Sequence, residues 1–540
     1  MHKLAIRGKF MQKKKILALT LIGAMGLNCV ACAKDTTTTK KKNKKSHKVT
    51  ETTVAETEPE KTEPELTPEV TPEITPEIST DYDPSAIEFL DEDLRYHYDL
   101  DIDLDPDTNR VYGSVIVDFY NNSDDAWDTI VLRDYPTYFE DPTVIENITD
   151  HRTGDALSMT REGEDQTVVH IPLTNPLRSG EEMTLSYDFE VTLPVVNDRY
   201  GLDEDNGIYN VTNFYPILGY YHDGEWSEEP YFPDGECFVS EISDYDVTLT
   251  LPSDMVVAST GVITDEQVNG DIKVVTMEAP CVRDFVFCAS SNFNVIEQDC
   301  NGVNVRFIYT KNFEDSISQL SPCTFDSIDY TFDFAEDNLG MYPYEELDVV
   351  LSNMSGGNAG GMEYPNLVII NLYINNGIIE EATYENILIH EVIHQWFMGI
   401  VGSNSGTEAW LDEGVTQYVS DSIFGEFTGE HFDYLTDSWD LISYNYLAED
   451  GYFPISRKNV EFPTTIEYVV AVYQMTAVTL GKIHDYMGDD SFYEFLNDYV
   501  HTYAFKNATG DDFFDLLLQY DSLDDEELRQ ILEMCWELEF

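Results

Sequence analysis

The sequence predicts a multidomain protein in which an N-terminal all-β domain is followed by an α+β domain that ends in helices. Three observations predict this fold class. The chain has 540 residues, which is more than one hydrophobic core usually holds. Residues 87–297 repeat strand patterns with no helix-length period between them. From residue 384 onward, helical periods dominate.

The first 31 residues have the organisation of a signal peptide. The basic stretch KFMQKKK precedes ILALTLIGAMGL, an apolar stretch too short to span a membrane stably. Cys32 follows the small residue Ala31 and resembles the lipidated cysteine of a bacterial lipobox. Cys29 is the alternative lipidation site, ordinary secretion is the alternative fate, and Met11 is the alternative start.

Residues 32–86 are expected to form a lipid-anchored, disordered stalk. Residues 33–48 hold seven lysines and one acid, which suits a position against anionic lipid headgroups. Prolines then recur among Thr and Glu, which favours extended polyproline II and a reach of about 90 Å for about 30 residues. The chain is therefore expected on the extracellular face of a bacterial cell membrane, with the membrane as a partner.

The predicted all-β domain, residues 87–297, begins with a hairpin. YHYDLDIDLDPDTNRVYGSVIVDFYN alternates polar and apolar residues, breaks at PDTN and alternates again. Further strand patterns follow in TVVHIPL, MTLSYDFEVTL, YDVTLTLP, KVVTMEAP and DFVFCAS. No helical period separates these segments.

The predicted second domain covers residues 298–540. NVRFIYT, ELDVVLSN and NLVIINLYI have strand patterns, and FDSIDYTFDFAEDNLG has the pattern of a helix that ends at Gly340. Helical periods follow to the end of the chain. The domain is therefore expected to be α+β, with its sheet first and its helices last.

The composition excludes one class of partner. The chain has 30 Lys and Arg against 103 Asp and Glu, a formal charge of −73. No basic surface of the size that nucleic acid requires can be assembled, so nucleic acid is not an expected partner. The six cysteines beyond the signal region form no CxxC pair and are too scattered for a disulfide framework.

The segment TYENILIHEVIHQWFMG predicts a helix with Thr383 as its N-cap and an end near Gly399. His390 and His394 then lie about 40° and about 6 Å apart on its surface, so both rings can face one metal ion. Glu391, beside that ion, can take a proton from the attacking water. The alternative is a helix that carries two histidines by chance.

A third ligand distinguishes these alternatives. Eighteen residues, 395–412, separate His394 from Glu413, which lies in EAWLDEGVTQYVSD, where a second helix would present its carboxylate. Two histidines and a glutamate leave the fourth tetrahedral position open, as catalytic Zn²⁺ requires, so one Zn²⁺ per chain is expected. Asp412 and Glu408 are the alternative ligands.

These motifs resemble those of the aminopeptidase N-like zinc family of the gluzincins. The family has HExxH, 18 residues and then Glu, and GGMEYP (residues 360–365) resembles its exopeptidase motif. Tyr473 in YQMTAVTL stands where the family has a catalytic tyrosine, although Met475 and Thr476 replace the usual Lys-Gly; Tyr468 is the alternative. The resemblance spans about residues 90–500.

The resemblance implies a thermolysin-like catalytic domain behind the β-domain, in a short bacterial lipoprotein member with a more open cleft. It implies a zinc aminopeptidase for peptides with a free N-terminus, in which Glu391 and Tyr473 are catalytic. Glu363 would hold the substrate's α-ammonium, in a binding segment formed by Gly360, Gly361, Met362 and Glu363. The alternatives are a zinc endopeptidase and a catalytically retired peptide-binding surface lipoprotein.

Overall fold

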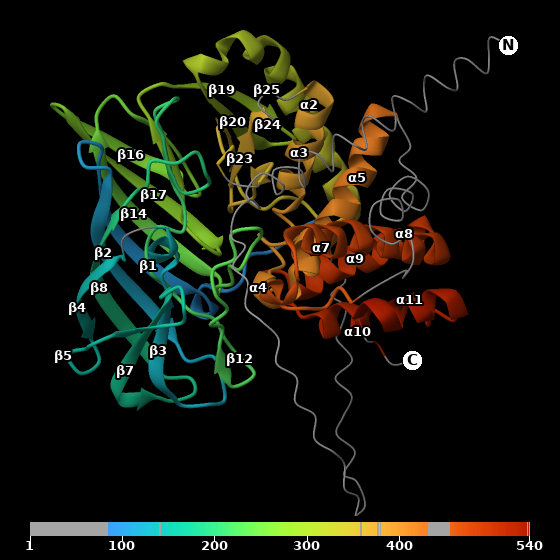
Figure 1. Cartoon of the computed structure of the whole chain (residues 1–540), viewed down its shortest axis with the longest axis horizontal. Helices are drawn as coiled ribbons and strands as arrows, with labels where there is room; N and C mark the ends of the chain where they lie inside the picture. The colour runs from blue at the N-terminus through green and yellow to red at the C-terminus, as the bar shows by residue number, and fades with distance from the viewer. Residues whose placement is uncertain are drawn as a thin grey trace, which may run out of the picture.

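The computed structural model describes residues 85–139, 142–356, 359–374, 377–378, 380–429, 454–536 and 538. Figure 1 shows a β-rich part beside a part that combines a sheet with all the long helices. The predicted fold class, a β-domain followed by an α+β domain with its helices last, is confirmed. The predicted signal peptide, the stalk and the lipidation site at Cys32 lie outside the described residues.

An eight-stranded sheet is the largest element of the β-domain. Its strand order is β16-β17-β14-β1-β2-β8-β4-β5. Strands β1 and β14 are parallel, whereas β1 and β2 form the predicted antiparallel hairpin. The strands are β1 (Tyr96–Asp105), β2 (Arg110–Tyr120), β4 (Val144–Asp150), β5 (Asp155–Ala156), β8 (Glu182–Thr192), β14 (Ser243–Pro252), β16 (Val262–Asn269) and β17 (Ile272–Val282).

Smaller sheets pack with this sheet around the core of the β-domain. Their orders are β15-β18-β10-β9 and β11-β3-β7-β6, and β12 pairs with β13. Alternate residues of β1, β8 and β14 are buried, as expected for a sheet with one face on a core. The strands are β3 (Trp127–Arg133), β6 (Thr160–Glu162), β7 (Val168–Leu177), β9 (Gly201–Asp203), β10 (Ile208–Val211), β11 (Ile217–Leu218), β12 (Tyr221–His222), β13 (Glu225–Trp226), β15 (Val256–Ser259) and β18 (Phe287–Ser290).

The sheet of the second domain has the order β19-β20-β21-β23-β22. The predicted boundary between residues 297 and 298 falls inside strand β19. Because β19 pairs with β20, the sheet of the second domain already begins at Phe293. Strands β20, β21 and β23 are parallel, and β22 is an antiparallel edge strand. The strands are β19 (Phe293–Cys300), β20 (Val303–Thr310), β21 (Glu346–Ser352), β22 (Gly361–Met362), β23 (Leu367–Asn371), and the paired β24 (Tyr373–Ile374) and β25 (Gly377–Ile378).

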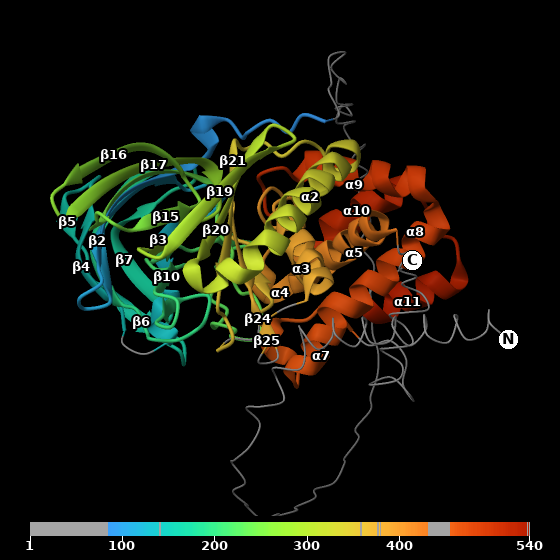
Figure 2. The same cartoon turned by 90° about the horizontal axis from the view of Figure 1, so that it is seen from above.

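Helices cover this sheet and form the C-terminal part of the described chain. Figure 2 shows α3 among the other helices, and it contacts both α2 and α5. The predicted helix that ends near Gly340 corresponds to α2, which begins before the predicted segment. The helices are α2 (Glu314–Asn338), α3 (Glu381–Ile393), α4 (Ser405–Ala409), α5 (Val415–Thr428), α7 (Thr465–Val469), α8 (Thr476–Met487), α9 (Asp489–Tyr503), α10 (Gly510–Tyr520) and α11 (Glu526–Trp536).

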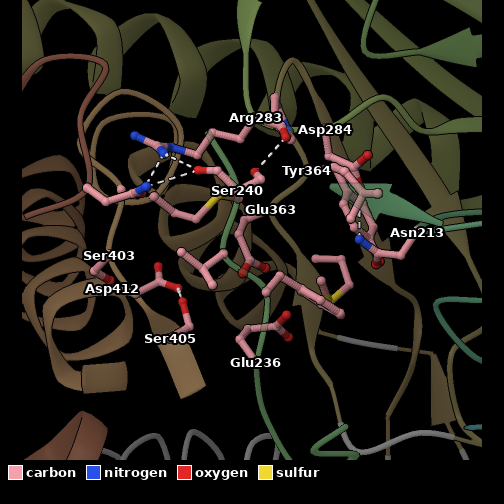
Figure 3. Close-up of a pocket in the computed structure, with 18 of the residues that line it drawn as sticks. Asn213, Glu236, Ser240, Arg283, Asp284, Glu363, Tyr364, Ser403, Ser405 and Asp412 are labelled. Carbon is pink, nitrogen blue, oxygen red and sulfur yellow. Dashed lines mark hydrogen bonds between the residues drawn. The ribbon is translucent and has the colours of Figure 1, made fainter. Parts of the chain in front are cut away.

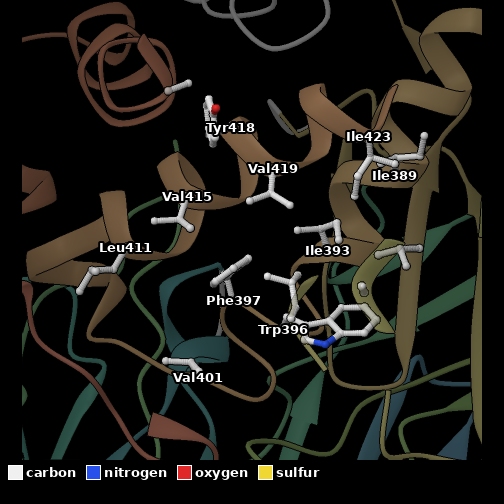
Figure 4. Packing of buried hydrophobic residues seen from close by; sticks show 14 of the residues in the cluster. Ile389, Ile393, Trp396, Phe397, Val401, Leu411, Val415, Tyr418, Val419 and Ile423 are labelled. Atoms are coloured by element: carbon white, nitrogen blue, oxygen red, sulfur yellow. The ribbon is translucent and has the colours of Figure 1, made fainter. Parts of the chain in front are cut away.

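Helix α3 is buried along most of its length. Figure 4 shows its apolar side chains packed against those of α5, among them Ile389, Ile393, Val419 and Ile423. Each such side chain contributes roughly 1.5–3 kcal/mol when it is fully removed from water. This packing makes the helix a rigid support for the polar side chains that it also carries.

The predicted bounds of this helix are wrong at both ends. Its N-cap is Glu380 rather than Thr383, and it makes no side-chain capping bond. The helix ends at Ile393 rather than near Gly399, because the chain turns after His394 and Met398 adopts a positive φ of 125°. The turn buries Trp396 and Phe397 beneath the helix, so an apolar pattern continues beyond its end.

A buried arginine connects the two domains behind this turn. The Arg283 guanidinium, from the β-domain, donates to the backbone oxygens of Gly399, Ile400 and Lys506 at 3.1, 3.2 and 2.8 Å. It also donates to Asn507 Oδ1 at 2.6 Å. Hydrogen bonds to a charged donor are stronger than neutral ones, so the β-domain is held firmly against the segment that follows α3.

The six cysteines within the described residues are buried free thiols: Cys237, Cys281, Cys288, Cys300, Cys323 and Cys535. Buried free cysteines of this kind pack as small apolar side chains. Within the described part of the chain, none of the helices combines the length and the apolar character that a membrane span needs.

Candidate active site

Three side chains predicted as metal ligands converge on one point. His390 Nε2 lies 3.1 Å from His394 Nε2, and each of these atoms lies 3.2 Å from Glu413 Oε2. Ligand atoms about 2.0–2.1 Å from a tetrahedral Zn²⁺ would lie about 3.3 Å apart. All three residues are at most 5% exposed. The donor set and its spacing therefore fit one zinc ion.

Local helix geometry brings these ligands together. His390 lies in the last turn of α3, and His394 is the C-cap that follows Ile393. Glu413 lies on a π-helical turn, η5 (Trp410–Gly414), between α4 and α5. Single π-helical turns are frequent at functional sites because the wider turn redirects consecutive side chains. Here the turn directs Asp412 and Glu413 to opposite nitrogens of His394.

Asp412 orients a ligand and does not itself face the metal position. Its Oδ1 lies 2.8 Å from His394 Nδ1, and its Oδ2 accepts a hydrogen bond from Ser405 Oγ at 2.9 Å. This arrangement fixes the His394 tautomer and leaves Nε2 for the metal. Glu408 is elsewhere: its Oε1 accepts from the backbone N–H of Gly510, at the start of α10. Glu413 is therefore the carboxylate positioned as the third ligand.

The electrostatics of two of the ligands, Glu413 and His390, suit this role. Although burial raises the pKa of the Glu413 carboxyl, the neighbouring His394 and His390 outweigh it and hold that pKa well below its usual range. Burial lowers the pKa of His390 despite its contact with Glu413. A metal requires a carboxylate and neutral imidazoles, and the site favours the charged Glu413 and the neutral His390.

Replacing Asp412 by Asn is expected to weaken zinc binding by roughly 10–100-fold, because partners that orient a histidine ligand have effects of this size. Asn keeps the shape of the side chain but removes the negative charge beside His394 Nδ1. Competition with a chelator of known affinity measures the change. Asp271→Asn, in the exposed turn between β16 and β17, is the matched control. Equal zinc affinity in Asp412→Asn and the wild type would contradict this role.

The predicted proton acceptor, Glu391, packs on the edge strand β22. A β-carbon built on Gly361 would lie 2.4 Å from Glu391 Oε1, so the side chain occupies space that only a glycine leaves free. Burial raises the pKa of the Glu391 carboxyl to about 8. A bound dication would favour its charged form and lower this pKa towards neutrality. Such a group can both accept and return a proton.

Glu363 follows the same edge strand and faces the same cavity as Glu391. Gln395, just after α3, holds its backbone, because Gln395 Nε2 donates to the carbonyl oxygens of Glu363 and Tyr364 at 3.4 and 3.2 Å. Gln395 Oε1 also accepts from Asn366 N at 2.9 Å. Burial, and then the neighbouring carboxylate of Glu236, raise the pKa of Glu363. A cation beside the Glu363 carboxylate would stabilise its charged form and so oppose the rise in pKa that burial and Glu236 cause.

Of the two candidate tyrosines, Tyr473 is the one that lines the cavity. It lies on a second π-helical turn, η8 (Val470–Met475), and its ring is 6.2 Å from that of His390, between centroids. Burial, followed by the nearby Glu413, raises the pKa of Tyr473 well above its usual value, so its hydroxyl keeps its proton. Tyr468 is fully buried and packs against Gly235 instead.

Among the residues that the β-domain contributes to the cavity are Arg199 and Glu236, which the motifs do not identify. Arg199 Nη1 donates to Glu236 Oε1 at 2.5 Å, and Arg199 Nη2 donates to Tyr231 Oη at 2.8 Å. Arg199 Nη1 also lies 3.6 Å from Met362 Sδ. The turn-forming letters PDGE around Glu236, between strand patterns, are the signal in the sequence that points to this loop.

The cavity around the ligands has a volume of about 730 Å³, which includes space open to solvent. Gly360, Gly361, Met362 and Glu363 line it together with His390, Glu391, His394 and Glu413. A second cavity of about 610 Å³ shares Glu236, Met362 and Glu363 with it and extends between the domains (Figure 3). All of the predicted site residues within the described part of the chain therefore meet in one place.

Comparisons with known proteins agree with this geometry. Residues 323–536 match the model of the Peptidase family M1 domain. Aminopeptidase M1 of Arabidopsis thaliana is 24% identical over 281 residues, which are 50% of this chain and 31% of that protein. The chain thus spans about a third of the length of the curated relatives it matches.

Solved structures share the fold over most of the chain. The M1 zinc metallopeptidase from Deinococcus radiodurans aligns with a TM-score of 0.58 at 18% identity, covering 81% of this chain and 92% of that one. A mutant of that metallopeptidase bound to a Tyr-Ser-Ala substrate aligns with a TM-score of 0.59 at 18% identity, with the same coverage. The likeness includes the β-domain, which lies outside the matched family model.

Proposed function

The chain carries the peptidase M1 domain of the aminopeptidase N-like gluzincins, and on this premise we propose that it is a zinc-dependent aminopeptidase that removes N-terminal residues from peptides. One observation carries the proposal: the buried carboxylate of Glu363 lines the same cavity as the three ligands and Glu391. A carboxylate fixed there can pair with a free α-ammonium, which an internal peptide bond lacks.

The residues divide the reaction among them. Zinc, when held by His390, His394 and Glu413, supplies a Lewis acid that activates water and polarises the scissile carbonyl. Glu391 accepts the proton of the attacking water and delivers it to the nitrogen of the leaving amine. The Tyr473 hydroxyl donates a hydrogen bond to the oxyanion that develops from the carbonyl.

Glu363 completes the arrangement at the other end of the first residue. By accepting hydrogen bonds from the α-ammonium, Glu363 places the first peptide bond, rather than a later one, beside Glu391. Fixing the substrate in this way removes orientational freedom before the reaction and lowers the barrier. The same residue therefore contributes to binding and to the choice of bond.

Turnover of aminoacyl-coumarin substrates by the purified chain tests the proposal. We expect release of coumarin from substrates with a free amine, loss of release with a chelator and recovery with added zinc. Absence of turnover on every aminoacyl substrate, in a chain that holds zinc, would contradict the proposed function. Cleavage of internal bonds instead would favour an endopeptidase.

For location, we propose a surface enzyme of a bacterial cell, anchored through a lipid on Cys32. The motif before Cys32 and the lysines after it support this proposal. The proline-rich segment that follows would then separate the catalytic domains from the membrane.

The Cys32→Ser variant is expected to move from the membrane fraction to the soluble fraction, because it lacks the thiol that a lipid would modify. Partition in a detergent two-phase system measures this change. Cys29→Ser is the matched control and should stay in the detergent phase. Unchanged partition of Cys32→Ser would contradict the anchor at this residue, and release of Cys29→Ser alone would place it at the other cysteine.

A further inference from the structure

The segment that carries Glu363 has little support from its own sheet. Strand β22 has only two residues, Gly361 and Met362, and among the described strands it pairs with β23 alone. Glu363 and Tyr364 come after the last paired residue. An edge strand this short holds the residues that follow it only loosely, so contacts from outside the sheet must set the position of the Glu363 carboxylate.

Tyr364 makes one of these contacts. Its side chain is only 3% exposed and packs in an apolar cluster that includes Met362 and Leu367. Its hydroxyl donates to Oδ1 of Asn213, in the β-domain, at 3.2 Å. Buried hydroxyls generally have a hydrogen-bond partner, and here the partner defines where the ring can lie. The bond therefore also restrains the neighbouring residue, Glu363.

The register of two strands brings Asn213 close to Asp284. Strands β10 and β18 are antiparallel, and Val211 lies opposite Phe287. Asn213 comes two residues after Val211, and Asp284 comes three residues before Phe287, so both lie beyond the same end of this pair. Asn213 Nδ2 donates to Asp284 Oδ2 at 2.8 Å. Asn213 has a positive φ of 45°, which asparagine tolerates better than most residues.

Asp284 determines which way the Asn213 amide points. Asp284 Oδ1 accepts from Tyr215 Oη and from the backbone N–H of Phe285, at 2.9 and 2.8 Å. Burial raises the pKa of Asp284 to about 7, although its three donors oppose the rise. Above that pH the carboxylate can only accept, so Asn213 turns its Nδ2 to Asp284 and keeps Oδ1 for Tyr364. Figure 3 shows Asp284, Asn213 and Tyr364, which lead from the β-domain to the segment after β22.

The residue before Asp284 reaches the metal side of the site. The Arg283 guanidinium donates to the backbone oxygens of Gly399 and Ile400, in the turn that follows the ligands of α3. Two consecutive residues of the β-domain thus contact both the turn behind the metal ligands and the chain of hydrogen bonds that ends beside Glu363. The separation of these two parts of the site is therefore set in part by the β-domain.

We propose that Asn213 is a positioning residue for the substrate's free N-terminus: through Tyr364, it fixes the Glu363 carboxylate relative to the metal ligands. This inference rests on the proposed aminopeptidase function and names a β-domain residue on which the choice of the first bond depends. Asn213 lines the second cavity rather than the cavity around the ligands, so it acts through Tyr364 and not on the substrate. Small displacements of a binding group have large effects on a reaction.

Two inhibitors that differ by one amine test this role. Leucine hydroxamate and its deamino analogue can both bind zinc through the hydroxamate, so the ratio of their inhibition constants reports on the pairing of the amine with Glu363. Tyr364→Phe removes only the hydroxyl, and Asn213→Gly removes the amide while glycine keeps the positive φ.

We expect the wild type to prefer the inhibitor with the amine, when measured above the pKa of Asp284. The preference should fall about fivefold in Tyr364→Phe, the effect of one buried hydrogen bond. It should fall about tenfold in Asn213→Gly, which breaks both links of the chain. The inhibition constant of the deamino compound and the zinc content should stay close to those of the wild type.

A control variant and a double variant separate positioning from general damage. Tyr384→Phe removes another buried hydroxyl of the same domain, which lies 2.6 Å from Thr324 Oγ1, and should keep the wild-type preference. Partial unfolding lowers the active fraction and hence the turnover, but it does not change a ratio of inhibition constants. The double variant of Asn213→Gly with Tyr364→Phe should lose no more preference than Asn213→Gly alone, because both changes break the same link.

The outcomes distinguish this inference from the function on which it rests. An unchanged preference in Tyr364→Phe would overturn the positioning role, even if Asn213→Gly failed to fold. Equal weakening of both inhibitors would also overturn it, because the damage would then lie at the metal and not at Glu363. Additive losses in the double variant would show that Asn213 does not act through Tyr364. A wild type that binds both inhibitors equally would instead contradict the proposed aminopeptidase function.

Discussion

The Glu391→Gln variant is expected to lose about a thousandfold in kcat while it keeps its zinc. Glutamine preserves the size of the side chain over Gly361, but it cannot accept the proton of the attacking water. A positioned general base contributes roughly 10²–10⁴ in rate, so the loss should be of this order. Steady-state turnover of an aminoacyl-coumarin measures the rate, and elemental analysis measures the metal.

A ligand variant provides the matched comparison for this result. Glu413→Gln removes a charge from the same cavity, but it should lose zinc together with activity, because its Oε2 lies 3.2 Å from both histidine nitrogens. If Glu391→Gln kept more than about a tenth of the wild-type rate, another residue would have to be the base. If it lost its zinc, Glu391 would be a ligand.

Acetylation of the substrate's N-terminus is expected to lower kcat/KM by at least about a hundredfold, which corresponds to roughly 2.7 kcal/mol. The acetyl group removes the positive charge, adds bulk and leaves the buried Glu363 carboxylate without its partner. Paired peptides that differ only in this group measure the effect.

The Glu363→Ala variant identifies the residue responsible for that difference. It should cleave free-amine peptides more slowly and reduce the gap between the free and the acetylated forms. Asp198→Asn, also in the cavity lining, is the comparison and should leave a large gap. Equal cleavage of both peptides by the wild type, at internal bonds, would replace the aminopeptidase with an endopeptidase.

Local rules were sufficient to predict the two histidine ligands. His390 and His394 are four residues apart, and four residues return to nearly the same side of a helix. This relation survives although the helix ends at Ile393, because His394 keeps helical backbone angles as the C-cap. Glu413 could be predicted as the third ligand from an expected second helix and from the family spacing, but no local rule indicates the π-helical turn that carries it.

Contacts between distant segments could not be predicted in the same way. Glu236 and Arg199 reach the cavity from the β-domain, and nothing near them in the sequence indicates the distant residues that they meet. Gln395 follows HExxH directly, yet its role in holding Glu363 depends on how β22 lies against α3. The role of Asp412 depends on which histidine nitrogen it meets. Such pairings are set by tertiary packing.

The central claim is that His390, His394 and Glu413 hold one zinc ion on which peptidase activity depends. The most direct measurement is a titration of the metal-free chain with zinc, following bound metal and turnover together. We predict that both rise in parallel and reach their plateau at one zinc per chain, and that His394→Ala shows neither at the same concentrations. Full turnover in a chain shown by elemental analysis to hold no metal would contradict the claim.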